Sequence, residues 1–242
     1  MADGLNAGGF KRGLLLACAC TVTLGAWLWL MGGSVSPWLP AHHHAASDWR
    51  SFAGLVIMWQ AMMVAMMTPS AIDWLLTYAA FSGSGTGAAG LFAGGYFTVW
   101  LGYSMAAAVL QTVLAHAGFL EMDGRLPARV GGAVLMAAGL LYFTPFQHAC
   151  LSHCRNPLSY FLTRWKNGPP NGFRLGLTHG GYCVGCCWLL MLTGFAAGVM
   201  NVLWMAVLTL LICVEKLAPR GERIGAVASA AMAVWGFVLL IR

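Results

Sequence analysis

Charged residues are scarce in this chain of 242 residues. Asp, Glu, Lys and Arg make up 8% of it and hydrophobic residues 60%, with a mean hydropathy of +0.74. Because soluble domains carry about 25% charged residues, this composition excludes an ordinary soluble domain. Each membrane span needs roughly 20 apolar residues, so the length suits one integral membrane domain, residues 1–242, of six helices. We therefore predict an all-α, polytopic transmembrane helical bundle.

Motifs of several function classes are missing as well. The chain has no nucleotide-binding loop and no acidic phosphorylation motif, which argues against an ATP-driven pump. It has no Ser-His-Asp or paired-carboxylate arrangement, so no conventional enzyme is predicted, although the question of catalysis stays open. The net charge of +6 is spread over loops without a basic block, which indicates membrane lipid rather than nucleic acid as the partner.

The apolar runs place the predicted helices. They cover residues 13–32, 52–80, 89–117, 130–146, 182–213 and 222–241. The fifth run is long for one span, so it is either one tilted helix or two pieces broken near Gly194 to Gly198, which would make seven helices. A His-containing loop at 33–51 carries His42-His43-His44, either a weak divalent-metal trap or a plain polar loop.

Eight cysteines are present, and five of them gather in two short clusters with histidines. These clusters define a Cys/His region, residues 148–187, predicted between helices four and five. The candidate metal ligands in it are Cys150, His153, Cys154, His179, Cys183, Cys186 and Cys187. Cys18, Cys20 and Cys213 lie inside apolar helices, so we interpret them as small buried apolar residues.

Several chemistries suit these clusters. Cys183 and Cys186 form a C-x-x-C pair, whose spacing lets two sulfurs reach one metal or each other. A tetrahedral zinc staple, a Cu(I) site of two or three thiolates, a disulfide, an iron–sulfur cluster and unpartnered buried thiols all remain open. His148 and Arg155 are candidate neighbours of the ligands, where the arginine would help to hold cysteines as thiolates.

A methionine stripe is the second soft-ligand feature. Met62, Met63, Met66 and Met67 lie one helical turn apart in two pairs, either as core filler or as a Cu(I) path. Asp73 follows inside the same predicted span, where a carboxylate is a functional hypothesis. Further candidates along the later apolar run are Met191, Met200 and Met205. Glu215-Lys216 at the far end of that run is interpreted as a pair at the membrane interface.

The motifs together resemble a bacterial family of predicted metal-binding integral membrane proteins of unknown function. The motifs that carry the resemblance are Met62-Met63-x-x-Met66-Met67-x-Pro69, Cys150-Leu-x-x-Cys154-Arg155 and Gly185-Cys186-Cys187-Trp188. The resemblance covers roughly residues 50–217, and the Gly-Cys-Cys-Trp block is its most specific part. It implies metal binding by the cysteines. It also implies a small soluble partner protein, because such a protein is often encoded beside family members.

From these observations we predict a multi-pass protein of a bacterial inner membrane that binds a soft metal ion. Copper is favoured as the metal and zinc is the alternative. The cysteines would bind the ion, and the methionine stripe would transfer it across or within the membrane. Two other functions remain open: a membrane thiol-disulfide oxidoreductase or metalloenzyme in which Cys183 and Cys186 react, and a non-catalytic subunit of a larger membrane complex.

Overall fold

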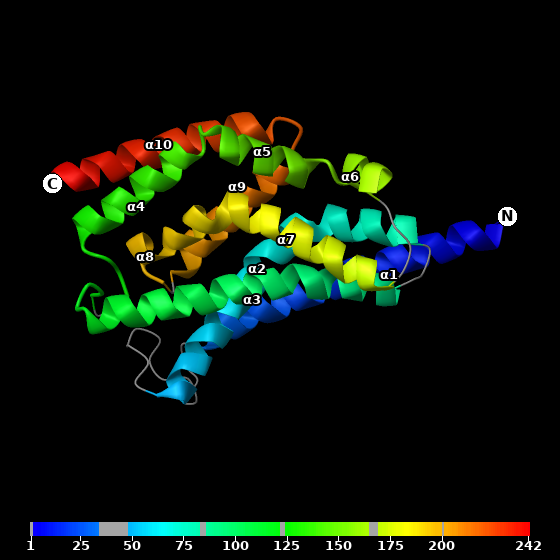
Figure 1. Ribbon diagram of the computed structural model, residues 1–242, viewed down its shortest axis with the longest axis horizontal. Helices are drawn as coiled ribbons and strands as arrows, with labels where there is room; N and C mark the ends of the chain where they lie inside the picture. The colour runs from blue at the N-terminus through cyan, green and yellow to red at the C-terminus, as the bar shows by residue number, and fades with distance from the viewer. Residues whose placement is uncertain (1, 34–47, 83–85, 122–123, 165–168, 200) are drawn as a thin grey trace.

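Helices account for nearly all of the chain that the structure describes. The computed structural model describes residues 2–33, 48–82, 86–121, 124–164, 169–199 and 201–242 (Figure 1). These residues form α1 (Ala2–Gly33), α2 (Trp49–Ser82), α3 (Thr86–His116), α4 (Ala128–Leu141), α5 (Pro145–Arg155), α6 (Pro157–Arg164), α7 (Pro169–Leu192), α8 (Gly194–Ala197), α9 (Val202–Leu217) and α10 (Gly221–Ile241). No strand occurs among them, so the predicted all-α bundle is confirmed. The His42-His43-His44 tract and Met200 lie outside the described residues.

Five segments are long and apolar enough to cross a membrane. They are residues 12–32 of α1, α2, residues 87–116 of α3, residues 171–197 of α7 with α8, and α10. The pair α4 and α5 qualifies as a sixth if its two members, bent by 66°, form one broken span. The predicted fifth helix at 182–213 is two pieces, because α7 ends at Leu192 and α9 begins at Val202. The alternative of a break near Gly194 to Gly198 is therefore confirmed.

The helices are arranged around α7. In Figure 1, α7 lies between α1 and α3 on one side and α4 and α10 on the other, and α2 crosses it in this view. The most extensive packing joins α3 to α7 and α4 to α10. Because the chain reverses after α8, α9 runs back beside α2 and α10 and its end reaches α5. The carboxyl end of α9 therefore lies near the cysteine helices rather than far from them.

Glycines allow α3 and α7 to cross closely. A Cβ atom on Gly176 of α7 would lie 2.1 Å from the carbonyl oxygen of Phe92 on α3, and one on Gly95 would lie 2.1 Å from the carbonyl oxygen of Phe173. Small residues of this kind let the backbones of membrane helices touch. The contact fixes the distance between α3 and the face of α7 that carries the cysteines.

The start of α5 brings the first cysteine cluster toward α7. Thr144 is the N-cap, and its hydroxyl oxygen accepts a hydrogen bond from the backbone N–H of Gln147. Pro145 follows at the first helical position, where its missing N–H costs nothing. These two residues end α4 and start α5 in a new direction, so the cysteines of α5 face α7.

The region between the clusters differs from the prediction. The predicted helices left residues 147–181 outside any helix, but residues 157–164 form α6 and α7 already begins at Pro169. The second cluster consequently lies in the middle of α7 instead of at the mouth of a helix. Polar residues in this region suggested a loop, whereas in the structure α6 buries Phe161 against the aromatic side chains of Trp74, Tyr78 and Phe92.

Candidate metal centre

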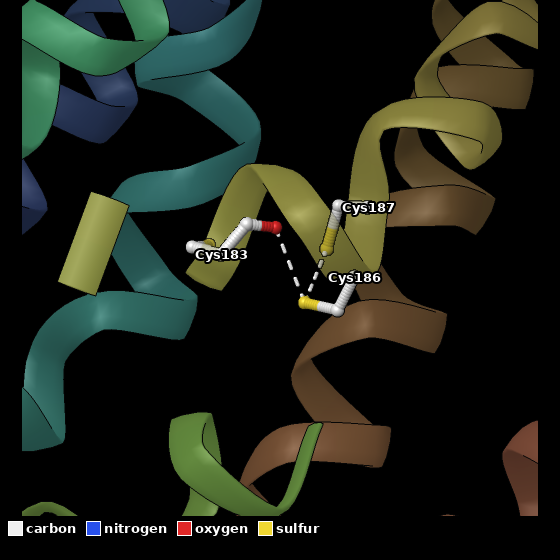
Figure 2. Close-up of side chains that lie close together, drawn as sticks. All are labelled: Cys183, Cys186 and Cys187. Carbon is white, nitrogen blue, oxygen red and sulfur yellow. Dashed lines mark hydrogen bonds between the residues drawn. The ribbon is translucent and has the colours of Figure 1, made fainter. Parts of the chain in front are cut away.

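Three cysteines of α7 bring their sulfur atoms together. Cys183, Cys186 and Cys187 offer ligand atoms that all lie within 4.8 Å of one another, and all three side chains are buried (Figure 2). The spacing explains the meeting, because residues three and four positions apart share one face of a helix. The Sγ atoms of Cys186 and Cys187 are 3.4 Å apart, and the Cys186 thiol donates to the carbonyl oxygen of Cys183 at 3.1 Å.

A fourth sulfur comes from α5. The Sγ atom of Cys154 lies 4.0 Å from that of Cys186. One hydrogen bond joins α5 to α7, and another ties α5 to α2. The indole N–H of Trp74 donates to the carbonyl oxygen of Cys154 at 2.7 Å, and the amide of Gln147 donates to that of Cys186 at 2.8 Å. We call Cys154, Cys183, Cys186 and Cys187 the sulfur group.

The spacing of the sulfur group suits a soft metal ion. Zinc–thiolate bonds of about 2.3 Å in a tetrahedral site separate the sulfurs by about 3.8 Å. The Cys154–Cys186 and Cys186–Cys187 sulfur separations, 4.0 and 3.4 Å, bracket that distance. All eight cysteines are free, so no disulfide competes for these sulfurs in this structure. The chemistry of the donors and their burial therefore fit a bound metal.

A buried lysine contacts the sulfur group from α9. The ammonium of Lys216 donates to the Sγ atom of Cys183 at 3.0 Å, and its side chain is only 8% exposed. The hydroxyl of Tyr96 on α3 lies 3.1 Å from the same sulfur. An ammonium in contact with a sulfur stabilises the thiolate form. The interpretation of Lys216 as an interfacial residue was wrong, because the reversal of the chain at α8 returns it to the cysteines.

Arg155 anchors the end of α9 that carries Lys216. Its guanidinium donates to the carbonyl oxygens of Glu215 and Ala218, the latter at 3.0 Å, and pairs with the carboxylate of Glu222 at 3.5 Å. The sequence predicted that this cation lies beside the thiolates, whereas in the structure it binds the last turn of α9. Arg155 therefore positions Lys216, and Lys216 supplies the charge beside the sulfurs.

Comparison with known families adds independent evidence about the metal. Residues 56–239, well over half of the chain, match the PpoB2 copper chaperone family. The chain belongs to this copper chaperone family. No curated protein and no solved structure matches it. The expected resemblance to a metal-binding family is thereby confirmed, and family and sulfur group together support copper as the metal. A copper chaperone interacts with other proteins, so membership also supports a protein partner.

Two histidines flank the sulfur group of this copper chaperone family member without joining it. His179 is buried and stacks on Trp74 with ring centroids 3.9 Å apart. Its Nδ1 atom finds no hydrogen-bond partner among the described residues. His153 stacks on Tyr182 at 3.8 Å, and its ring centroid lies 6.3 Å from that of His179. Among the described residues, the group whose candidate ligand atoms lie within 4.8 Å of one another contains three cysteines and no histidine. The ligand role of both histidines therefore stays a prediction.

The other predicted residues differ in how near they come to the sulfur group. Cys150 is buried against α7, where a Cβ on Gly185 would lie 3.1 Å from its sulfur. His148 is exposed on α5, and Asp73 is exposed on α2, so neither side chain enters the core. The four methionines of α2, with Met191 and Met205, are buried in the same continuous core as the cysteines.

Lys216 and Tyr96 are the site residues that sequence reasoning missed. A lysine inside an apolar helix was a usable signal, since such charges are rarely idle in a membrane. Tyr96 gave no comparable signal, because an aromatic residue in a membrane helix is usually part of the core. Only the α3–α7 crossing shows that its hydroxyl reaches Cys183.

Proposed function

We propose that this member of the copper chaperone family binds Cu(I) at the sulfur group and passes it to a partner protein at a bacterial inner membrane. One observation carries the proposal: four buried thiols from α5 and α7 converge beside a buried ammonium. Cu(I) is soft and prefers two or three thiolate ligands, so the group offers more sulfurs than one ion needs. An additional sulfur lets ligands be exchanged one at a time during transfer.

The methionines of α2 are proposed as the transfer path. Met62 with Met66, and Met63 with Met67, stack one turn apart, and all four are buried in the core that contains the cysteines. Thioethers bind Cu(I) without losing a proton, so they hold it more weakly than thiolates do. A weak chain of ligands next to a strong site suits movement of an ion. We propose a small soluble protein as the partner at its end, as the resemblance implies.

Metal content tests the binding step. Protein purified in detergent without added metal is analysed for copper and zinc, beside a Cys183→Ser/Cys186→Ser variant. The control is Cys18→Ser/Cys20→Ser, because these cysteines are exposed on α1 and not buried as the sequence suggested. We expect about one copper per chain in the wild type and control, and none in the variant. Zinc at the same level would indicate a structural staple. No metal with oxidised thiols would indicate disulfide chemistry.

Transfer kinetics test the methionine path separately. In a Met62→Leu/Met66→Leu variant, copper content should be unchanged, because leucine conserves volume in a core. Transfer of Cu(I) to a chromophoric chelator in solution, followed by stopped flow, should slow at least about tenfold as two soft ligands are lost. The matched control is Met105→Leu, which changes an exposed methionine of α3. An unchanged rate in the double variant would reduce the stripe to core packing.

A further inference from the structure

Lys216 has an environment that sulfur binding alone does not require. Among the described residues, the buried charged side chains are Glu215 and Lys216. The neighbouring Glu215 is also buried, and the guanidinium of Arg155 donates to its backbone carbonyl oxygen. The ammonium of Lys216 itself donates to the Cys183 sulfur at 3.0 Å. A positive charge is thus fixed next to a group of ligands whose purpose is to bind a positive ion.

Four cysteines do not by themselves distinguish copper from zinc. A Cys₄ group is a common structural zinc site, and divalent ions gain more from anionic thiolates than monovalent ones do. A chaperone with this group therefore needs some other feature to exclude zinc. A fixed cation provides one, because it repels a divalent ion twice as strongly as a monovalent ion at the same position.

We propose that Lys216 is the specificity-determining residue of the copper site, favouring monovalent Cu(I) over divalent Zn(II) by its charge. The inference rests on the proposed function and adds the basis of its selectivity. Cu(I) with two thiolates carries one negative charge, which the ammonium neutralises. On any one set of thiolates, the Zn(II) complex carries one more positive charge than the Cu(I) complex, so the same ammonium favours the copper complex.

The surrounding contacts keep the ammonium in place. Arg155 binds the carbonyl oxygens of Glu215 and Ala218 on either side of Lys216, so the last turn of α9 is held against α5. The Tyr96 hydroxyl touches the same sulfur from α3. Since the lysine side chain is buried, it cannot swing into bulk water when a metal enters without moving these neighbours.

Substitution of Lys216 tests the inference through a ratio of affinities. Dissociation constants for Cu(I), Ag(I) and Zn(II) are measured by chelator competition on wild type, Lys216→Met and Lys216→Arg. One unit-charge interaction at about 4 Å and an effective dielectric of about 20 corresponds to roughly a thousandfold in affinity. We therefore expect the preference for Cu(I) over Zn(II) to fall roughly a thousandfold in Lys216→Met. The ratio of the Ag(I) and Cu(I) dissociation constants should not change, because the two ions carry the same charge.

Controls separate charge from structure. Lys216→Arg keeps the charge and should keep the preference, whereas Arg129→Met removes an exposed charge of α4 and should change nothing. If Lys216→Met does not fold, as judged by near-ultraviolet circular dichroism, Lys216→Gln replaces it with a polar side chain. An unchanged preference in the folded neutral variant overturns the inference. A wild type that binds no Cu(I) overturns the proposed function instead.

Discussion

The Gly176→Ala variant tests whether the α3–α7 crossing builds the site. Its Cβ would lie 2.1 Å from the carbonyl oxygen of Phe92 and 2.9 Å from the backbone nitrogen of Tyr96. Both are backbone atoms, so no side chain can turn aside and the helices must separate. Overpacking of this kind costs about 1–3 kcal/mol, and the better helix propensity of alanine offsets about 0.5–1 kcal/mol of it. We expect a net loss of about 1–2 kcal/mol.

The functional effect follows from the same displacement. Tyr96 would move away from Cys183, whose sulfur its hydroxyl now meets at 3.1 Å. At about 2–4 °C per kcal/mol for a chain of this size, the unfolding midpoint should fall by roughly 2–8 °C. Thermal unfolding in detergent, followed by tryptophan fluorescence, measures the midpoint. Cu(I) competition with a chelator measures the accompanying loss of affinity.

Gly181→Ala is the matched control, since it makes the same change on the same helix. A Cβ there meets nothing within 4 Å, so only the propensity gain of about 0.5–1 kcal/mol remains. We expect Gly181→Ala to be as stable as wild type or slightly more stable, with normal copper affinity. If Gly176→Ala matched it in both measurements, the close crossing would not determine the site.

Two further predictions concern hydrogen bonds that hold the site together. Arg155→Gln removes charged donors to the carbonyl oxygens of Glu215 and Ala218; it should destabilise the protein by about 2–3 kcal/mol and lower Cu(I) affinity although Arg155 is no ligand. Urea unfolding measures the stability, and chelator competition measures the Cu(I) affinity. Equal values of both in the variant and the wild type would contradict this prediction. Trp74→Phe removes one N–H donor to the carbonyl oxygen of Cys154. The free energy of unfolding should fall by about 1 kcal/mol, which lowers the unfolding midpoint. The copper content, measured by elemental analysis, should stay the same. Loss of copper would instead show that this hydrogen bond sets the position of the ligand.

Much of the fold could be predicted because a membrane restricts the choices. Long apolar runs leave the helix as the simplest way to satisfy buried backbone groups, and the all-α bundle followed from that. The cysteines could be nominated because thiols three or four residues apart share a helical face. Membership of the copper chaperone family agrees with the metal that these soft donors favour.

Other features could not be predicted because they depend on contacts between distant segments. The polar composition of residues 157–168 suggested a loop, but the packing of Phe161 among aromatic residues makes 157–164 a helix. Asp73 was a reasonable candidate inside an apolar run, yet it faces outward because the neighbouring Trp74 takes the buried position. Periodicity alone does not say which face of an almost wholly apolar helix points inward.

The sequence by itself determined that this chain is a helical membrane protein with soft ligands gathered in its middle, since composition and spacing are local properties. The tertiary structure alone decided which ligands meet and which charge accompanies them. Cys154 joins the cysteines of α7 because α5 bends away from α4. Lys216 reaches Cys183 because the chain reverses between α7 and α9, which brings residues 33 positions apart into contact.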